Sequence, residues 1–246
     1  MKKIFFKKRI PEPEFMNIAE QKEFEKISLI NYKKWTIPLI DDLLNQFKIK
    51  DFKNKNLKIL DLACGPGLIS KNLSSIFPKS EIIGIDISKY SIKLAKKNCR
   101  GIKNVKFIIG SAQNIPFPND YFDIIICKDS LHHFQNALKS IKEMYRVVKK
   151  NGIIYIQDLR RDVPFYLIKT ILPPDNLVKK LIYYSTRSAY LLSEIKKILK
   201  KIGIKKFVLK KRNITKKIIN KYEKIGINIE SLKQTFSSRF ILIIKK

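Results

Sequence analysis

The stretch Lys58-Ile59-Leu60-Asp61-Leu62-Ala63-Cys64-Gly65-Pro66-Gly67-Leu68-Ile69-Ser70 decides the fold of this chain. It begins as a short apolar run of strand length, reaches two glycines, and continues as an apolar segment that suits a helix. Glycine at positions 65 and 67 permits a sharp turn and a close approach of a ligand to the backbone. The helix that follows presents unpaired N–H groups to an anion. The stretch therefore predicts a strand, a ligand-binding turn and a helix. A turn of the same kind without a ligand is the alternative.

A second apolar strand is expected at Ser80-Glu81-Ile82-Ile83-Gly84-Ile85-Asp86-Ile87-Ser88, and it too ends on an acid. Asp86 comes 19 residues after Gly67. This is close to the spacing of about 20 residues at which βαβ nucleotide sites place a carboxylate on ribose hydroxyls. Ser70 stands where a dinucleotide motif has its third glycine, and Pro66 lies between the other two. The pattern therefore indicates a nucleoside ligand and argues against NAD.

Composition predicts one α/β domain with small additions. A chain of 246 residues that is 45% hydrophobic can bury one sizeable core. The three cysteines are scattered and form no C-x-x-C pair, so we expect neither disulfides nor a structural zinc, and we expect no metal site. The only apolar run near the N-terminus is Ile4-Phe5-Phe6. We therefore expect no signal peptide, no membrane span and a cytoplasmic protein.

The net charge of +31 has two interpretations. Only 8 of the 52 basic residues are arginine, and phosphate-reading surfaces draw on the planar fork of arginine as well as on lysine. This favours a solvated lysine-rich surface. Residues 193–217, however, hold eleven basic residues against the single acid Glu194, a density that attracts RNA or an anionic membrane. Nucleic acid therefore stays open as a partner through the basic C-terminal third.

Four motifs in order give the chain a family resemblance. They are Leu60-Asp61-Leu62-Ala63-Cys64-Gly65-Pro66-Gly67, Gly84-Ile85-Asp86-Ile87-Ser88, Gly110-Ser111-Ala112-Gln113-Asn114-Ile115-Pro116-Phe117, and Leu131-His132-His133-Phe134. The series resembles class I S-adenosylmethionine-dependent methyltransferases, in particular the small-molecule branch of ubiquinone and menaquinone biosynthesis. The resemblance covers roughly residues 55–160. It implies a doubly wound, seven-stranded, mostly parallel Rossmann-like sheet with an N-terminal helical cap, and S-adenosylmethionine as the cofactor.

The resemblance also implies the cofactor-binding residues. They come from the four loops that carry the motifs: Asp61, Ala63, Cys64, Gly65 and Gly67; Asp86 and Ile87; Ser111 and Ala112; Lys128 and Ser130. Asp61 is expected to favour the cationic amino-acid end directly or through water, and Asp86 to bind the ribose hydroxyls. The family usually has an acid at the position of Ser111, which would accept from the adenine amino group. A serine hydroxyl accepts more weakly.

The loop after the strand 123–127 is expected to face the transferred methyl group, because ligands bind outside the carboxyl ends of parallel strands. His132, His133 and Asp129 are the candidates for a general base. The alternative is that the histidines cap the next helix. The loop has no Asp/Asn-Pro-Pro-aromatic motif and no Pro-Cys pair, which disfavours methylation of exocyclic base amines and of cytosine C5. The acids and arginines of residues 158–162 either orient a polar substrate or pair with one another.

The remaining chain divides into an N-terminal part and a series of helices and strands. We expect an arm and helical cap over 1–50, a methyltransferase domain over 51–246, and an acceptor-binding insertion over 163–190. In the cap, Tyr32 and Trp35 are either lid residues or core residues. Further helices are expected over 68–77, 88–98, 136–150 (closed by Gly152) and 193–201 (ended by Gly203), and strands over 104–109, 153–157, 207–211 and 240–244. Residues 214–238 are expected to be weakly helical, without an assigned purpose.

The sequence thus predicts methyl transfer from S-adenosylmethionine to a small-molecule acceptor by in-line displacement. Two alternatives stay open. One is a methyltransferase that acts on tRNA or another nucleic acid, and the other is a protein that binds the cofactor without catalysis. Neither the acceptor nor the oligomeric state follows from the sequence.

Overall fold

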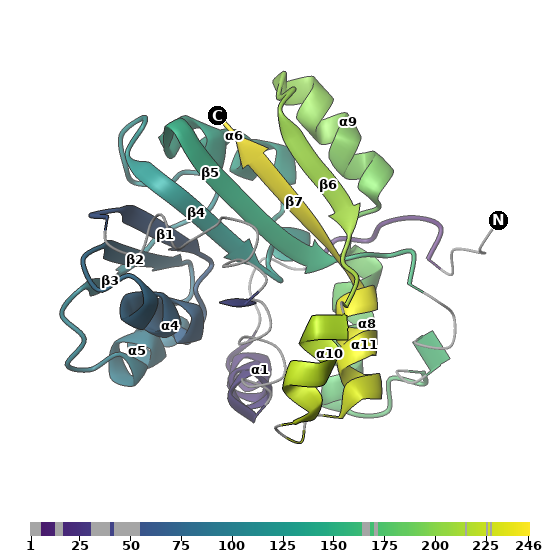
Figure 1. Ribbon diagram of the computed structural model, residues 1–246. Helices are drawn as coiled ribbons and strands as arrows, with labels where there is room; N and C mark the ends of the chain where they lie inside the picture. Colours follow the sequence, from purple (N-terminus) through teal and green to yellow (C-terminus); the bar gives the residue numbers. More distant parts are fainter. Residues whose placement is uncertain are drawn as a thin grey trace.

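The fold is a three-layer α/β sandwich, seen in Figure 1 as a twisted sheet with helices on both faces. The computed structural model describes residues 6–12, 17–30, 40–41, 55–163, 168–169, 172–214, 216–224, 226 and 228–246. Tyr32 and Trp35, expected to be either lid or core residues, lie outside the described residues. So do residues 31–39 and 42–50 of the expected helical cap and, in the expected insertion, Phe165 and Tyr166.

The sheet has seven strands in the order β3-β2-β1-β4-β5-β7-β6. Their bounds are β1 Lys58–Leu62, β2 Glu81–Asp86, β3 Val105–Ile109, β4 Phe122–Lys128, β5 Val148–Leu159, β6 Phe207–Lys211 and β7 Arg239–Lys245. The first five pair in parallel, whereas β7 runs antiparallel to both β5 and β6. The predicted seven-stranded, mostly parallel sheet is therefore confirmed. The strand order reverses between β1 and β4, which is where open α/β sheets form their ligand crevice.

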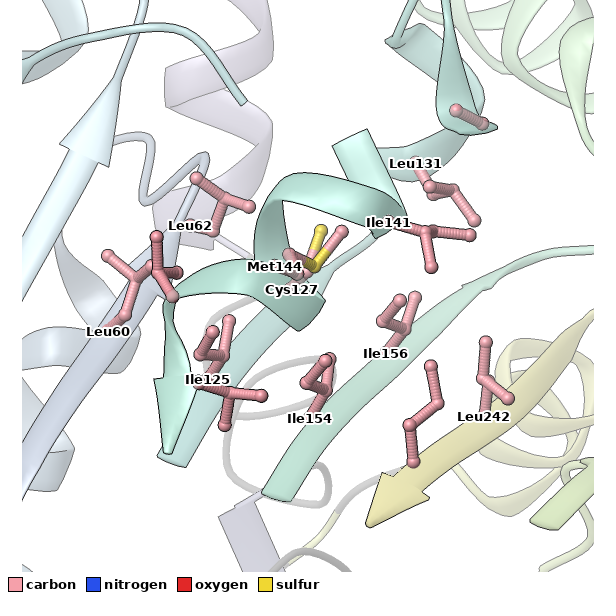
Figure 2. Packing of buried hydrophobic residues seen from close by; sticks show 14 of the residues in the cluster. Leu60, Leu62, Ile125, Cys127, Leu131, Ile141, Met144, Ile154, Ile156 and Leu242 are labelled. Carbon is pink, nitrogen blue, oxygen red and sulfur yellow. The ribbon is translucent and has the colours of Figure 1, made fainter. Parts of the chain in front are cut away.

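Both faces of the central strands are buried, which explains their near-continuous apolar sequences. Along β1, Leu60 and Leu62 pack on one face, whereas Ile59 packs on the other. The first face continues through Ile125, Ile154 and Leu242 beneath helix α6 (Ala137–Val147), as Figure 2 shows. Because side chains alternate along a strand, one sequence pattern supplies two cores.

The crossover helices begin where side chains can accept the first free N–H groups. Helix α5 (Lys89–Asn98) begins after its N-cap Ser88, the first residue of the helix expected over 88–98, and the Ser88 hydroxyl accepts from the backbone N–H of Ser91. Asn136 caps α6 and Asn176 caps α8 (Leu177–Ser188) in the same way. Helix α9 (Leu192–Ile202) ends at Gly203 in the left-handed conformation, as predicted.

The expected helix over 136–150 is shorter than predicted. It ends at Val147, and β5 starts at the next residue, where Val148 pairs with Phe122. Gly152 is therefore not a helix cap. It lies inside β5, where a Cβ would come within 2.7 Å of a Val148 methyl carbon and 2.9 Å of the Lys149 carbonyl oxygen. The left-handed residue of this region is Asn151, with φ of 65°. The glycine is thus explained by close backbone packing.

Helix α9 lies near the top of Figure 1, whereas the other helices that are not crossovers of the first five strands lie beyond the carboxyl ends of β4 and β5, toward the bottom. They are α1 (Ile18–Ile30), α8, α10 (Lys216–Glu223) and α11 (Ile229–Ser237), and α1 packs on both α5 and α8. The weakly helical region predicted over 214–238 thus contains two short helices. Helix α4 (Leu68–Ile76) follows the glycine turn, and the short 3-10 helix η2 (Leu131–His133) follows β4. The carboxyl ends of the parallel strands, together with α1, α4, α8 and η2, enclose the site.

Candidate functional site

Two adjoining pockets open at the carboxyl ends of β1, β2 and β4. The Asp86 pocket is lined by Asp86, Ile87, Ser91, Ser111, Ala112 and, from α1, Glu25. The His132 pocket is lined by His132, Cys64, Lys128, Arg239 and, from α8, Leu181 and Ile182. Ala63, Gly65, Asp129, Ser130 and His133 line both pockets. Most of the residues predicted to hold a cofactor are therefore brought together around one continuous space.

The glycine turn between β1 and α4 needs each of its glycines for a different reason. Gly65 and Gly67 both have positive φ, of 50° and 75°. A Cβ on Gly67 would come within 2.8 Å of the Phe107 ring, so this residue permits close packing under the turn. A Cβ on Gly65 would meet nothing within 4 Å, and Gly65 lines both pockets. The turn therefore presents a bare backbone to the site.

Asp86 connects the glycine turn to the next crossover helix. One carboxylate oxygen accepts from the Gly65 N–H at 2.9 Å, and the other accepts from the Ser88 N–H at 2.9 Å. Burial raises the pKa of Asp86, although these backbone donors oppose the shift. The Ile87 N–H is a further backbone donor to this carboxylate. A carboxylate accepts about four hydrogen bonds, so Asp86 has capacity left for a hydroxyl donor in the pocket that it lines.

Asp61 is buried under the site and lines neither pocket. Its Oδ2 accepts from the backbone N–H of Ser70 at 3.0 Å and from the Ser70 hydroxyl at 2.6 Å. Burial raises its pKa to about 6. Oδ2 thus faces the first turn of α4, whereas Oδ1 is buried without a hydrogen-bond partner among the described residues. A contact of Asp61 with the ligand, directly or through water, stays a prediction. Ser70, in the position of the missing third glycine, is its donor.

Asp129 is a poor candidate for the general base. Its carboxylate pairs with Arg239, at 2.8 and 3.1 Å, and with the Lys128 ammonium at 2.7 Å. Burial opposes ionisation, but the two cations outweigh it and hold the pKa of Asp129 far below its usual range. A carboxylate of this kind does not take a proton near neutral pH. Lys128 lines the His132 pocket with its ammonium on Asp129.

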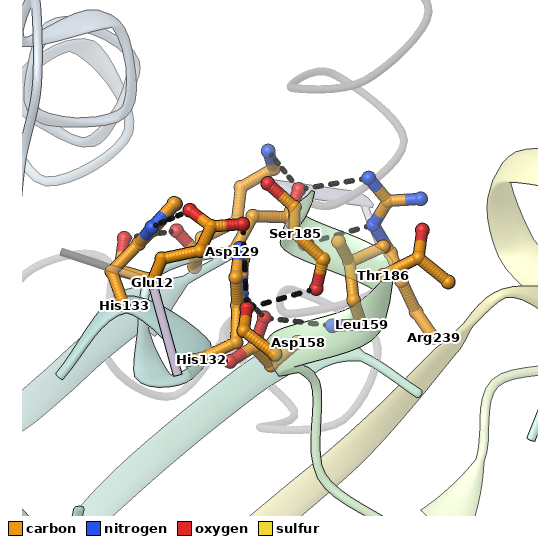
Figure 3. A network of polar contacts seen from close by, with 12 residues as sticks. Glu12, Asp129, His132, His133, Asp158, Leu159, Ser185, Thr186 and Arg239 are labelled. Carbon is orange, nitrogen blue, oxygen red and sulfur yellow. Dashed lines mark hydrogen bonds and ion pairs between the residues drawn. The ribbon is translucent and has the colours of Figure 1, made fainter. Parts of the chain in front are cut away.

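His132 has the geometry of a general base that is oriented by a carboxylate (Figure 3). Its Nδ1 lies 2.6 Å from an oxygen of Asp158, and its backbone N–H donates to the other oxygen at 2.7 Å. Burial disfavours the charged ring, but Asp158 outweighs burial and raises the pKa of His132. Its Nε2 is buried and has no hydrogen-bond partner among the described residues. The Asp158 contact fixes the proton on Nδ1, which leaves Nε2 as the acceptor.

His133 lines both pockets and is held from outside the sheet. Its Nδ1 lies 2.9 Å from the carboxylate of Glu12, on the N-terminal arm (Figure 3). The arm is fixed by Arg9, which donates to the carbonyl oxygens of Ser188 and His132. Burial and the adjacent His132 lower the pKa of His133, although Glu12 opposes them. The two histidines therefore differ: burial and the other ring favour neutral His133, and Asp158 favours charged His132.

Several residues that line the pockets or hold the histidines escaped the sequence reasoning. Glu12 and Glu25 lie in the expected arm and cap with no motif around them, and Arg239 lies just before the expected last strand over 240–244. Asp158 was noted, but neither expected role matches its contact with His132, whereas Arg160 and Asp162 do pair with each other. The detectable signal for Asp158 was an acid at the end of β5, next to the strand that precedes the histidines.

The basic stretch 193–217 lies on α9 and on β6, the edge strand of the sheet. Lys210 and Lys211 are exposed on β6, as is Lys206 just before it, whereas Arg212 is buried. Charged residues on an edge strand prevent pairing with the edge of another sheet. This accounts for part of the charge without a nucleic acid.

Comparison with known proteins matches residues 53–224 of this chain to the family described as "Methyltransferase domain". The chain belongs to this methyltransferase family. The ubiquinone biosynthesis O-methyltransferase of Pelagibacter ubique is 29% identical over 63% of this chain and 72% of that protein. The demethylmenaquinone methyltransferase of a Geobacillus strain is 33% identical over 51% of this chain and 52% of its own length. In these two relatives and in the uncharacterized methyltransferase YcgJ of Bacillus subtilis, the part that aligns with this chain makes up 40% to 72% of the relative's own length.

Solved methyltransferase structures share the fold. The plantazolicin methyltransferase BpumL, solved with a triazolic desmethylPZN analog and SAH, has a TM-score of 0.66 at 22% identity, covering 93% of this chain and 95% of its own. No helix in the described ranges combines the length and apolar composition of a membrane span. The same described residues include no cluster of three or more His, Cys, Asp or Glu side chains suited to a metal ion.

The residues of this methyltransferase domain fit S-adenosylmethionine. The backbone at Gly65 faces open space in the pockets, as a bound amino-acid tail requires. Asp86 lines the Asp86 pocket, and its carboxylate has acceptor capacity for ribose hydroxyls. Ile87 and Ala112 add apolar walls for an adenine ring, and the Ser111 hydroxyl accepts from the Gln113 N–H at 3.1 Å.

Proposed function

We propose that this methyltransferase transfers the methyl group of S-adenosylmethionine to a hydroxyl group of a small, largely apolar molecule. The observation that carries the proposal is the buried Nε2 of His132, which has no hydrogen-bond partner in the described part of the chain, on a residue that lines the pocket beside the glycine turn. A general base next to a methyl-transfer site is needed when the acceptor carries a proton that must leave.

The Asp86 pocket holds the nucleoside in this proposal. Asp86 accepts from the ribose hydroxyls, and Ile87 and Ala112 flank the base. The N-terminus of α4 receives the carboxylate of the amino-acid tail, and Gly65 leaves room beside it. The bound cofactor supplies a methyl group on a sulfonium, which is already an activated leaving group. The protein therefore contributes alignment, exclusion of water and removal of the acceptor proton.

The His132 pocket receives the acceptor. Its outer wall is apolar and comes from α1 and α8, with Ile27, Leu181 and Ile182, which suits a ring or an aliphatic chain. His132 takes the acceptor proton on Nε2, and Asp158 stabilises the resulting imidazolium through Nδ1–H. One relative is named as an O-methyltransferase of ubiquinone biosynthesis, which supports a hydroxyl as the acceptor.

This proposal makes turnover depend on pH in a defined direction. Only neutral His132 accepts a proton, and Asp158 raises the pKa of His132. The rate with a hydroxyl acceptor should therefore rise as the pH passes upward through that pKa.

The test is methyl transfer from labelled S-adenosylmethionine to a panel of small phenols and hydroxyquinones, with bulk RNA in a parallel reaction. We expect a labelled phenol ether, no stimulation by RNA, and a loss of about 10²- to 10⁴-fold in kcat for His132→Gln. The affinity for S-adenosylhomocysteine should stay the same in that variant. His133→Gln should lose less, since the Nδ1 of His133 is engaged by Glu12. Labelled RNA, or equal turnover of His132→Gln and wild type, would contradict the proposal.

A further inference from the structure

Helix α1 is joined to α5 by two side-chain hydrogen bonds above the Asp86 pocket. The Ser88 hydroxyl donates to Oε1 of Gln21 at 2.9 Å, and the Ser91 hydroxyl donates to Oε1 of Glu25 at 3.1 Å. Residues four apart lie on one face of a helix, so Gln21 and Glu25 form one polar edge of α1. Both residues line the pocket together with Ser88 and Ser91. The cap helix therefore closes the side of the pocket that the sheet leaves open.

Glu25 is buried in a way that its protein contacts do not explain. The residue is only 4% exposed, and its Oε2 is buried without a hydrogen-bond partner among the described residues. A buried carboxyl oxygen without a donor or acceptor costs free energy, and such groups are rare without a functional reason. Because Glu25 lines the Asp86 pocket, a ligand in that pocket is the available partner.

The surroundings of Glu25 favour its protonated form. Burial raises its pKa to about 7, and the negative charge of Asp86 acts in the same direction, against the hydrogen bond from Ser91. The other titratable groups that line the pocket are Asp129 and His133, and Lys89 and Lys93 of α5 are exposed. The residues through which α8 lines the adjoining pocket, Leu181, Ile182 and Ser185, carry no charge. Among these groups, therefore, there is no lysine or arginine in the lining of the Asp86 pocket that would stabilise the carboxylate of Glu25.

We propose that Glu25 is a cofactor-binding residue of the cap: its protonated Oε2 donates to a ribose hydroxyl oxygen while ionised Asp86 accepts from the ribose hydroxyls on the opposite side. The inference rests on the proposed function for the identity of the nucleoside. It assigns different tasks to two carboxyl groups of one pocket, since one group is held by backbone donors and the other by a single serine. Gln21, a neutral side chain on the same edge, holds α1 to the N-cap of α5.

Cofactor binding is then linked to one proton. The bound state needs protonated Glu25, so above the pKa of about 7 each binding event takes up a proton, and the affinity falls by up to about tenfold per pH unit. Below that pKa the affinity is independent of Glu25 titration. An amide at this position donates a hydrogen bond at every pH and should remove the dependence.

The experiment is calorimetric titration at pH 6 and pH 8.5, in two buffers of different ionisation enthalpy. The probes are S-adenosylhomocysteine and 5′-deoxy-5′-methylthioadenosine, which has the same nucleoside without the titrating amino-acid tail. Wild type should take up a proton and bind the thioadenosine about tenfold or more weakly at pH 8.5. Glu25→Gln should bind at both pH values as wild type does at pH 6, without proton uptake. Glu25→Ala should lose about tenfold at pH 6 for both probes. Glu23→Gln, on the same helix outside the pocket, is the matched control and should follow wild type.

The outcomes separate this inference from the proposed function. If wild type binds neither probe, the proposed function fails. If wild type binds both probes and Glu25→Ala binds them equally well, the role of Glu25 is refuted. If Glu25→Gln loses as much affinity as Glu25→Ala, or if wild type binds more tightly at pH 8.5, Glu25 acts as an ionised acceptor and the proposal is wrong. Thermal unfolding of the free variants identifies a variant that has not folded, and Glu25→Gln, which keeps the size of the side chain, then decides.

Discussion

Replacing Asp158 by Asn changes one atom of a buried carboxylate on which three N–H groups converge. Oδ1 accepts from His132 Nδ1 at 2.6 Å and from the Leu159 N–H at 2.7 Å, and Oδ2 accepts from the His132 N–H at 2.7 Å. In the best orientation of an amide, its oxygen keeps the first two contacts and its NH₂ group faces the His132 N–H. A buried donor without an acceptor costs about 1–3 kcal/mol, and loss of the negative charge weakens the other two contacts by about 1 kcal/mol in total. We therefore expect Asp158→Asn to lower the free energy of unfolding by about 2–4 kcal/mol.

The loss should also depend on pH in one direction. Asp158 raises the pKa of His132 against the effect of burial. The stability from this pair is therefore fully present below the unfolded pKa of about 6.5 and is lost as the pH rises through the folded value. The gap between wild type and Asp158→Asn should thus be larger at pH 6 than at pH 9.

Urea unfolding followed by circular dichroism measures both effects. Asp120→Asn is the control, because the side chain of Asp120 is 47% exposed and pairs with Lys246 on the surface. It should cost less than about 1 kcal/mol. A penalty for Asp158→Asn as small as that of the control, or a gap that widens as the pH rises, would refute the reasoning about the His132 pair.

Three further predictions follow from the packing and charges around the site. Asp129→Asn should lower the free energy of unfolding by about 3 kcal/mol at pH 7, because it leaves Arg239 and Lys128 largely buried without their carboxylate. Since the pKa of Asp129 is lowered, the difference in free energy of unfolding between wild type and Asp129→Asn should shrink as the pH falls below the unfolded pKa of about 4. The same difference at acid and at neutral pH in urea titrations would argue against this. Gly84→Ala should lower the urea midpoint by the equivalent of about 1–3 kcal/mol, because its Cβ would lie 2.5 Å from the Phe107 ring; an unchanged midpoint would mean that the ring moves freely. All three cysteines are buried with raised pKa values, so Ellman's reagent should modify them only after denaturation, and fast reaction of any one in the native protein would contradict the structure.

The sheet was predictable from sequence because its signals are local. Apolar runs of strand length, the glycines of the first turn and Ser88 as an N-cap each act within a few residues. The position of Gly152 was misread because a glycine after a helical pattern predicts a cap, whereas close packing against Val148 requires it here. That packing lies inside β5, which starts at Val148, within the range that the apolar pattern had assigned to the helix over 136–150.

The candidate site was predictable where a residue lies in the turn that follows a strand, as Gly65 and Asp86 do. Asp129 looked equivalent to the histidines in sequence, and its pairing with Arg239, more than a hundred residues away, is a tertiary contact that no local pattern reveals. Glu25 and Glu12 lie on segments that fold over the sheet from the N-terminal side, so their role depends on docking and not on spacing. Local sequence patterns thus predicted the residues in the turns that follow the strands. The ion pairs of the site and the N-terminal segments that cover it depend on tertiary packing.

Calorimetric titration of the wild type and of Asp86→Ala with S-adenosylhomocysteine tests the central claim most directly. We expect one site per chain, and a dissociation constant that is about 10- to 100-fold larger in Asp86→Ala, because charge-assisted hydrogen bonds to the ribose are lost. No binding to the wild type, or the same dissociation constant in a folded Asp86→Ala variant, would contradict the assignment of this pocket.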